Sequence, residues 1–174
     1  MKNFLFVSAE NDALANCKAG GMADVVRDVP RQIATTGDHV HVVVPAYNRL
    51  HKNGCLISEL KFNICGEATV ATIYEVAPKK KIEGITHYVI DHPEIVEGNI
   101  AHIYNDDPEE PFFTDAVKYF IFNTAVAQAV KQNIFDDVDV VHLHDWHTAL
   151  LAFHKAFHQD FTILKESWFV YSIH

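Results

Sequence analysis

The sequence predicts an α/β fold with a doubly wound, mostly parallel sheet. Three observations predict it: short apolar runs of strand length, a helical pattern between the first two of them, and polar turns directly after strands. The chain has 174 residues, of which 49% are hydrophobic and 21% are charged. These values are ordinary for one globular domain with a full core, so we treat residues 1–174 as a single domain.

The first fifty residues predict a strand, a helix and a strand. Residues 4–9 (FLFVSA) form a nearly continuous apolar run, typical of a strand that is buried on both faces. Residues 39–47 (HVHVVVPAY) are β-branched and apolar again, and Gly37 ends the helix between them. Pro30 predicts a kink in that helix. The residues expected on its buried face are Met22, Val25, Val26, Val29 and Ile33.

The second half of the chain adds strands and helices to this unit. Residues 67–78 and 85–93 predict a hairpin or a pair of strands. Residues 115–131 (DAVKYFIFNTAVAQAVK) predict a largely buried helix, with Thr114 or Asp115 as its N-cap.

The last fifty residues place a polar turn after a strand. Residues 138–143 predict a strand, a helix begins near Thr148, and residues 168–174 (WFVYSIH) predict a final strand. The HDWH turn, residues 144–147, therefore follows a strand, as does the glycine turn at residues 18–21. Because open α/β sheets bind ligands at the carboxyl ends of their strands, we expect both turns at one edge of the sheet.

Composition excludes some classes of partner. The formal net charge of −9 argues against nucleic acid and anionic membranes, and the lysines at 79–81 are expected in a solvated loop. The N-terminal apolar run is too short for a signal peptide, so we expect a cytoplasmic protein. The three cysteines, Cys17, Cys55 and Cys65, form no CxxC pair, and we expect reduced thiols. Cys17 is either inert or mildly activated by Lys18.

The glycine turn is a candidate anion site. Lys18, Gly20 and Gly21 precede a helix, whose unpaired N–H groups attract negative charge. The turn matches neither a GxGxxG pattern nor a P-loop. Local features alone leave two alternatives open, a phosphate-binding turn and a merely tight turn.

The HLHDWH segment also has alternative interpretations. His142, His144, Asp145 and His147 could ligate a metal, although the aspartate lies one place early for the metallo-hydrolase pattern. For sugar binding, Asp145 accepts hydroxyl hydrogen bonds, Trp146 offers an apolar face and His147 donates. A structural role in the core is the interpretation that we favour for His142.

Three segments in register, KAGGMADVV, VVHLHDWHTALL and VYSIH, resemble the bacterial glycogen synthase and plant starch synthase family across the whole chain. The resemblance implies GT-B architecture, in which two Rossmann-like domains face each other across a cleft. It implies transfer of glucose from ADP-glucose or UDP-glucose to the non-reducing end of an α-1,4-glucan, with retention of configuration and without metal or cofactor. We therefore expect an incomplete, Rossmann-like N-terminal domain that lacks the second domain and is inactive alone.

On the donor side, the resemblance implies roles for residues of the glycine turn. Lys18, Gly20 and Gly21 would meet the diphosphate of the nucleotide sugar, and Asp24 would help to shape the pocket. In the family, the second domain binds the nucleoside of the donor. The sequence therefore does not decide between ADP-glucose and UDP-glucose as the donor.

On the acceptor side, the resemblance implies that Asp145 orients sugar hydroxyls, supported by Trp146 and His147. His174 would contact the transferred glucose, and Tyr104 would lie beside the acceptor channel.

Some features depart from the family or point elsewhere. Lys118 stands where the family has arginine, which leaves the contacts of its helix open. The alternatives are a non-catalytic module that binds α-glucan or self-associates through a sheet edge at residues 168–174, and a metal-dependent hydrolase.

Overall fold

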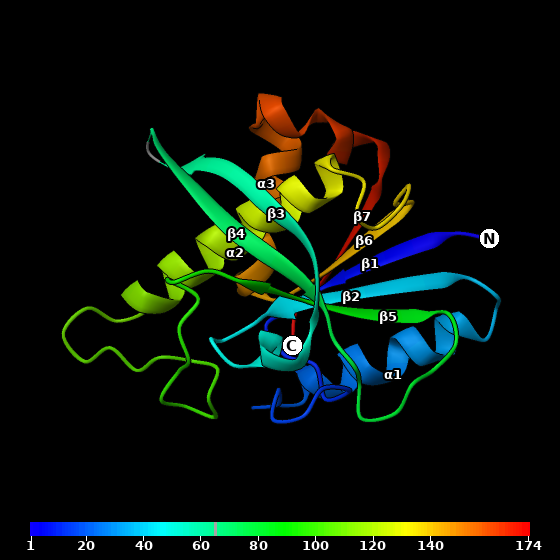
Figure 1. Cartoon of the computed structure of the whole chain (residues 1–174), viewed down its shortest axis with the longest axis horizontal. Coiled ribbons are helices and arrows are strands. Elements are labelled where there is room, and N and C mark those ends of the chain that lie inside the picture. The colour runs from blue at the N-terminus through cyan, green and yellow to red at the C-terminus, as the bar shows by residue number, and fades with distance from the viewer. Residues whose placement is uncertain (65) are drawn as a thin grey trace.

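The structure is a computed structural model that describes residues 1–64 and 66–174. A seven-stranded sheet runs through its centre in the order β3-β4-β5-β2-β1-β6-β7 (Figure 1). The β3–β4 and β4–β5 pairs are antiparallel, and the other four pairs are parallel, which confirms the mostly parallel sheet. The strands are β1 (Asn3–Val7), β2 (His39–Pro45), β3 (Cys55–Ile64), β4 (Glu67–Glu75), β5 (Ile85–Asp91), β6 (Val140–His144) and β7 (Trp168–Ser172).

Helices cover both faces of the sheet. Helix α1 (Met22–Ala34) lies on one face, whereas α2 (Phe113–Lys131) and α3 (Ala149–Phe157) pack together on the other (Figure 1). Strand β1 therefore has its helical connection on one face, and β6 has its connection on the opposite face. This arrangement is the predicted doubly wound fold. Among the described residues, no helix is long and apolar enough to cross a membrane.

The predicted helix is confirmed as α1, but its buried face differs from the prediction. It continues through Pro30 as one helix and buries Met22, Ala23, Val26 and Pro30 against the sheet. Val29 was predicted on this face but is exposed. The reason is that the buried residues lie near the i, i+4, i+8 row, so the i+7 position of Val29 falls at its margin.

The predicted N-cap of α2 is wrong. The N-cap is Phe112, and no side chain caps the helix. Asp107, from the preceding loop, accepts hydrogen bonds from the backbone N–H and the hydroxyl of Thr114 at 2.9 and 3.0 Å. The carboxylate of Asp115 points inward to a buried lysine, so neither predicted residue acts as a cap. The expectation of a largely buried helix is confirmed.

Strand β3 has no counterpart in the sequence prediction. It pairs with β4, and Leu60 is its one buried residue among those described. Residues 60–64 (LKFNI) alternate apolar and polar side chains, a strand signal that the sequence analysis did not use, whereas residues 55–59 show no alternation and are mostly exposed. The predicted pair of strands after it is confirmed as β4 and β5.

The described thiols are not reactive groups of the site. Cys17 is buried, and burial raises its pKa to about 12, so its thiol stays protonated near Lys18. Cys55 is unpaired and exposed. The expectation for Cys65 lies outside the described residues. Lys79 is exposed as predicted, and its ammonium also pairs with Asp12 at 2.7 Å.

Candidate functional site at the carboxyl edge of the sheet

The two motif turns lie at the same edge of the sheet. Strands β1 and β6 are parallel neighbours, with Val7 beside Leu143, so the chain leaves both at their carboxyl ends. From β1 the sheet continues to β2 on one side and to β6 on the other, which makes this a topological switch point. Open α/β sheets bind ligands at such points.

Asp145 has an unusual backbone at this edge. Its φ of 57° and ψ of −179° fall in a region that almost only glycine adopts. Its N–H donates to the carbonyl of Ser172 at 2.9 Å, and its Oδ1 accepts the N–H of His174 at 2.8 Å. Such a conformation costs about 1–3 kcal/mol, persists where surrounding contacts fix it, and is typical of functional sites.

Three histidines form a stack beside Asp145. The rings of His142 and His144 lie 4.3 Å apart, and His144 Nδ1 lies 3.0 Å from His174 Nε2. Burial lowers the pKa of His144 to about 3, so its imidazole is neutral at pH 7. His142 is half-buried and shares a hydrogen bond with the hydroxyl of Ser172, so it is not the core residue that we favoured.

Trp146 and His147 follow Asp145 in the short 3-10 helix η2 (Trp146–Thr148). Trp146 is 47% exposed, whereas His147 is buried between Tyr104, at 5.1 Å, and Tyr119, at 4.7 Å between ring centroids. Burial lowers the pKa of His147 to about 4, so it is a neutral hydrogen-bonding group at pH 7. The pair therefore combines an accessible apolar ring with a fixed polar one.

The glycine turn is held by an acidic residue that the sequence analysis missed. The backbone N–H groups of Ala19 and Gly20 donate to Glu10 Oε2 at 2.6 and 2.7 Å. The ammonium of Lys18 lies 2.7 Å from both oxygens of Asp24. Glu10 lies three residues after β1 and is only 3% exposed. An acid at the end of a buried strand is the signal that could have identified it, because carboxylates are buried only with partners.

The start of α1 remains open beside this turn. Gly21 is the N-cap, and no side chain caps the helix. A Cβ added to Gly21 would meet no described atom within 4 Å. The absence of a side chain thus leaves space next to the positive end of the helix dipole, where anions bind.

Tyr104 connects the glycine turn to the long loop after β5. Its hydroxyl donates to Glu10 Oε1 at 2.5 Å. Burial, together with this hydrogen bond, raises the pKa of Tyr104 well above its ordinary value. Glu10 therefore joins the glycine turn to the loop that carries Tyr104.

Lys118 fixes that loop to α2, which answers the question left by the missing arginine. Its side chain is fully buried. Its ammonium donates to the carbonyl of Ile103 and to Asn105 Oδ1, both at 2.7 Å, and to Asp115 Oδ1 at 2.8 Å. Burial lowers the pKa of Lys118, whereas the carboxylate of Asp115 opposes that shift.

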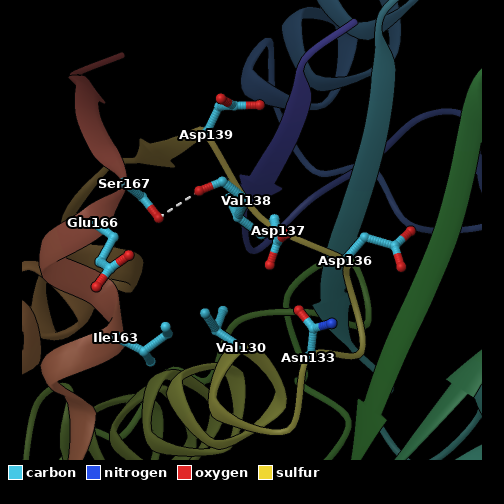
Figure 2. A pocket seen from close by; sticks show the side chains of 9 residues that line it. All are labelled: Val130, Asn133, Asp136, Asp137, Val138, Asp139, Ile163, Glu166 and Ser167. Carbon is cyan, nitrogen blue, oxygen red and sulfur yellow. Dashed lines mark hydrogen bonds between the residues drawn. The ribbon is translucent and has the colours of Figure 1, made fainter.

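Two hollows of similar size lie at opposite ends of the sheet. The hollow at the carboxyl end has a volume of about 390 Å³ and is lined by the aromatic rings of Tyr104, Phe112 and Trp146 and by polar residues that include Asp106 and Asp115. The hollow at the amino end has a volume of about 350 Å³ and is acidic (Figure 2). Its carboxylates are those of Asp136, Asp137, Asp139 and Glu166.

The acidic hollow does not form a metal site. Figure 2 shows the carboxylates of Asp136, Asp139 and Glu166 pointing in different directions, while Ser167 donates to the carbonyl of Val138. Within residues 1–64 and 66–174, no three histidine, cysteine, aspartate or glutamate side chains are placed to hold a metal ion. This statement covers the HLHDWH segment as well.

Residues 3–174 match the family model described as the starch synthase catalytic domain. The chain belongs to this family. It is 29% identical to a glycogen synthase of Exiguobacterium sibiricum over 168 residues, covering 95% of this chain and 33% of that protein. It is 27% identical to a glycogen synthase of Bacillus cereus over 183 residues, covering 99% of this chain and 34% of that protein.

The fold is shared with a solved starch synthase. The catalytic domain of starch synthase IV from Arabidopsis thaliana, bound to ADP and acarbose, matches with a TM-score of 0.78 at 18% identity. The match covers 99% of this chain and 34% of that chain. The chain thus spans about a third of the length of the relatives that it matches.

The family's site residues predicted from the sequence fall into two connected groups. Asp145, Trp146, His147 and His174 lie together at the end of β6, with Tyr104 against His147. Lys18, Gly20, Gly21 and Asp24 lie in the glycine turn and the start of α1. Glu10 connects the two groups, and Phe112 adds an aromatic ring that the sequence analysis did not single out.

Proposed function

We propose that this domain is the acceptor-side, N-terminal part of a retaining glucosyltransferase that acts in the cytoplasm. The observation that carries the proposal is Asp145, whose strained backbone holds a carboxylate next to His174 and Trp146. Support comes from membership of the starch synthase catalytic domain family and from the fold shared with a starch synthase bound to ADP and acarbose. The unpaired thiols of Cys17 and Cys55 suit a reducing compartment.

The proposed reaction moves glucose from ADP-glucose or UDP-glucose to the non-reducing end of an α-1,4-glucan. The bond from glucose C1 to the diphosphate oxygen breaks, a bond from C1 to the acceptor O4 forms, and the acceptor hydroxyl proton is released. Lys18 and the uncapped start of α1 stabilise the charge that develops on the leaving diphosphate. Lys18 exchanges Asp24 for this ligand, and the space beside Gly21 admits it.

On the acceptor side, Asp145 accepts hydrogen bonds from sugar hydroxyls and His174 contacts the transferred glucose. Trp146 offers its exposed ring to a pyranose, and neutral His147 supports it. The hydrogen bond from Tyr104 to Glu10 joins the loop after β5 to the glycine turn. The donor side and the acceptor side of the proposed site are therefore held at a fixed distance from each other.

We further propose that the 174-residue chain does not transfer glucose alone. Its glycine turn faces a donor from one side, and the relatives contain about twice as much additional polypeptide. A nucleotide sugar held by one wall keeps much of its surface in solvent, whereas binding sites enclose most of their ligand.

The test is transfer of labelled glucose from ADP-glucose and from UDP-glucose to maltoheptaose. The chain would be assayed alone and fused to the remaining two thirds of the Exiguobacterium sibiricum glycogen synthase. We expect no transfer by the chain alone, transfer by the fusion, and loss of transfer in the fusion carrying Asp145→Ala. Transfer by the chain alone contradicts its inactivity, and a folded fusion without transfer contradicts the transferase.

A second candidate function is assembly through the edge strand β7. In this strand and just after it, Trp168 is 80% exposed and Ile173 is 82% exposed. An unpaired edge with apolar side chains favours pairing with another strand. Sedimentation over a range of concentrations tests this candidate, which predicts a dimer that Trp168→Lys disrupts. A monomer at every concentration contradicts it.

A further inference from the structure

We propose that Phe112 contacts glucan: together with Trp146, it forms the walls of a subsite for one pyranose ring of an α-glucan. This inference rests on the proposed function, because it takes an α-glucan as the acceptor. It adds to that function a residue that lies outside the three motifs shared with the family.

The shape of the hollow at the carboxyl end fits a sugar ring. Its volume of about 390 Å³ lies within the range of small-molecule pockets, about 300–1,000 Å³. The ring centroids of Phe112 and Trp146 are 6.2 Å apart, and their planes meet at 81°. Ile100, Tyr104 and His147 also line the hollow, together with the polar residues Asn105, Asp106 and Asp115. Two aromatic walls at nearly a right angle can contact the C–H groups of a pyranose and leave its hydroxyls at the open side.

Both aromatic walls are accessible. Phe112 is 67% exposed and Trp146 is 47% exposed. The ring of Tyr119 packs edge-on against the indole of Trp146, with 5.5 Å between the ring centroids. This contact restricts the orientation of the indole. Neighbouring exposed aromatic rings on a fixed scaffold mark a binding surface, because they bury apolar area only when a ligand arrives.

The backbone of Phe112 gives an independent argument. Its φ of 68° and ψ of 3° place a bulky residue in the left-handed region, which such residues rarely adopt. The N–H of Ala116 donates to the Phe112 carbonyl at 2.8 Å, and Asp107 holds Thr114, so the turn is fixed. Because the ring is mostly exposed, its packing within the chain does not offset the strain. Strain of this kind persists at ligand-binding positions.

A polar group is available in the same hollow. His147 lines it and is only 7% exposed, and its Nδ1 has no partner among the described residues. Since burial lowers the pKa of His147 to about 4, the imidazole is neutral at pH 7. The neutral ring therefore lines the hollow without placing a positive charge against the sugar.

The experiment is a titration of the 174-residue chain with maltoheptaose, followed by NMR at the Trp146 indole N–H and the Phe112 backbone N–H. We expect both signals to shift and saturate. Phe112→Ala is expected to weaken binding by about 2- to 12-fold, the range for one aromatic contact. The matched control is Phe113→Ala, which removes a neighbouring ring that is 59% exposed and does not line the hollow, and it should bind as the wild type does.

A second variant separates the ring from the strained backbone. Phe112→Gly should lose as much affinity as Phe112→Ala, while melting about 2–4 °C higher than Phe112→Ala because glycine adopts positive φ freely. Unchanged affinity in Phe112→Ala, or equal weakening in Phe113→Ala, overturns the inference.

Two outcomes distinguish this inference from the proposed function. If Trp146→Ala weakens binding but Phe112→Ala does not, the subsite is overturned while glucan binding stands. If maltoheptaose shifts neither signal, the subsite is overturned as well, and the transfer assay of the fusion then decides the proposed function on its own.

Discussion

The two ends of the sheet place left-handed backbone on different kinds of residues. At the amino end, the positive φ angles belong to residue types that adopt them at low energy: Gly37, Gly84, Asn133 and Asp136. At the carboxyl end, they include Tyr47, Ala101 and Phe112, whose residue types rarely adopt positive φ, and Asp145, whose ψ of −179° places it in a region that almost only glycine adopts. The amino end thus turns the chain with little strain, whereas the carboxyl end retains strain.

The two ends of the sheet also differ in the side chains that line their hollows. Their hollows have similar volumes, but among the described residues the one at the amino end has carboxylates that do not converge and no aromatic ring, whereas the one at the carboxyl end combines aromatic rings with Asp106 and Asp115. At the carboxyl end, hydrogen bonds of Glu10 hold the glycine turn, and hydrogen bonds of Lys118 hold the loop after β5. Strain that is held by a rigid support is typical of a functional site. The carboxyl end of the sheet therefore has the features of a functional site, and the amino end does not.

The largest expected effect comes from removing the buried cation at the carboxyl end. Lys118→Met leaves the carboxylate of Asp115, which is 3% exposed, without its partner. Losing one member of a buried pair costs about 3–5 kcal/mol, so the free energy of unfolding should fall by about that amount. Urea denaturation at pH 7 measures it, and Lys118→Arg should restore much of the loss.

The same substitution at the amino end is the control for this prediction. The ammonium of Lys2 lies 3.2 Å from Asp139, but both side chains are exposed. Exposed ion pairs contribute little, so Lys2→Met should give a urea midpoint indistinguishable from that of the wild type. Equal losses at Lys2 and Lys118 would contradict the claim that the two ends are supported differently.

Glu10→Ala should have the next largest effect. It leaves the N–H groups of Ala19 and Gly20 and the hydroxyl of Tyr104 without their acceptor. Unsatisfied buried polar groups cost about 1–3 kcal/mol each, less where water reaches them, and we expect a net loss of about 1–3 kcal/mol. Hydrogen exchange should accelerate at the amides of Ala19 and Gly20. Glu10→Gln keeps an acceptor oxygen. We therefore expect the amides of Ala19 and Gly20 to stay protected from exchange in Glu10→Gln and to lose protection in Glu10→Ala.

A smaller effect is expected at Asp145, where one substitution should be more stable than another because it relaxes the backbone. Both Asp145→Gly and Asp145→Ala remove the carboxylate that accepts the N–H of His174, but only glycine relaxes the backbone. We therefore expect the glycine variant to have a free energy of unfolding about 1–2 kcal/mol higher than the alanine variant. The control is Asn133→Gly at the amino end, which should change it by less than about 0.5 kcal/mol. A glycine variant less stable than the alanine variant would rule out strain at Asp145.

The stability of the chain should also depend on pH through its buried histidines. Burial depresses the pKa of His144 to about 3, whereas an unfolded imidazole titrates near about 6.5. Between these values the unfolded chain binds the proton and the folded chain does not, so the free energy of unfolding falls as the pH decreases from about 6.5 toward 3.

Urea denaturation at pH 6 and pH 5 measures this slope. Each buried histidine contributes up to about 1.4 kcal/mol per pH unit, so His144→Asn should reduce the slope by as much as that. The control is Phe113→Ala, at an exposed residue that does not titrate, which should leave the slope unchanged. A slope that is the same in the wild type and in His144→Asn would contradict the burial of a neutral His144.

Patterns with a strong local signal allowed most of the fold to be predicted. The apolar runs of β1, β2 and β6 indicate strands buried in a parallel sheet, and strand order then brings the HDWH and glycine turns to one edge. The apolar length of α2 indicates its burial. These features depend on side chains that are close in the sequence.

Features that depend on distant contacts could not be predicted. Strand β3 was missed although residues 60–64 alternate apolar and polar side chains; its first half, residues 55–59, has no such alternation and is placed by pairing with β4. The cap of α2 fails as a prediction because Asp107 and Lys118 engage the two expected capping residues. The role of Glu10 depends on Tyr104, which lies ninety-four positions further along the chain. No local pattern reports such a partner.

The left-handed backbone of Asp145 also has a consequence for selection in the laboratory. Consider a library of variants of this chain, screened once for heat resistance alone and once, within the fusion, for glucosyl transfer. The first screen should enrich glycine at position 145, because glycine relaxes the turn, and the second should retain aspartate. Positions where the two screens enrich different residues would then outline the reactive surface without any ligand being bound.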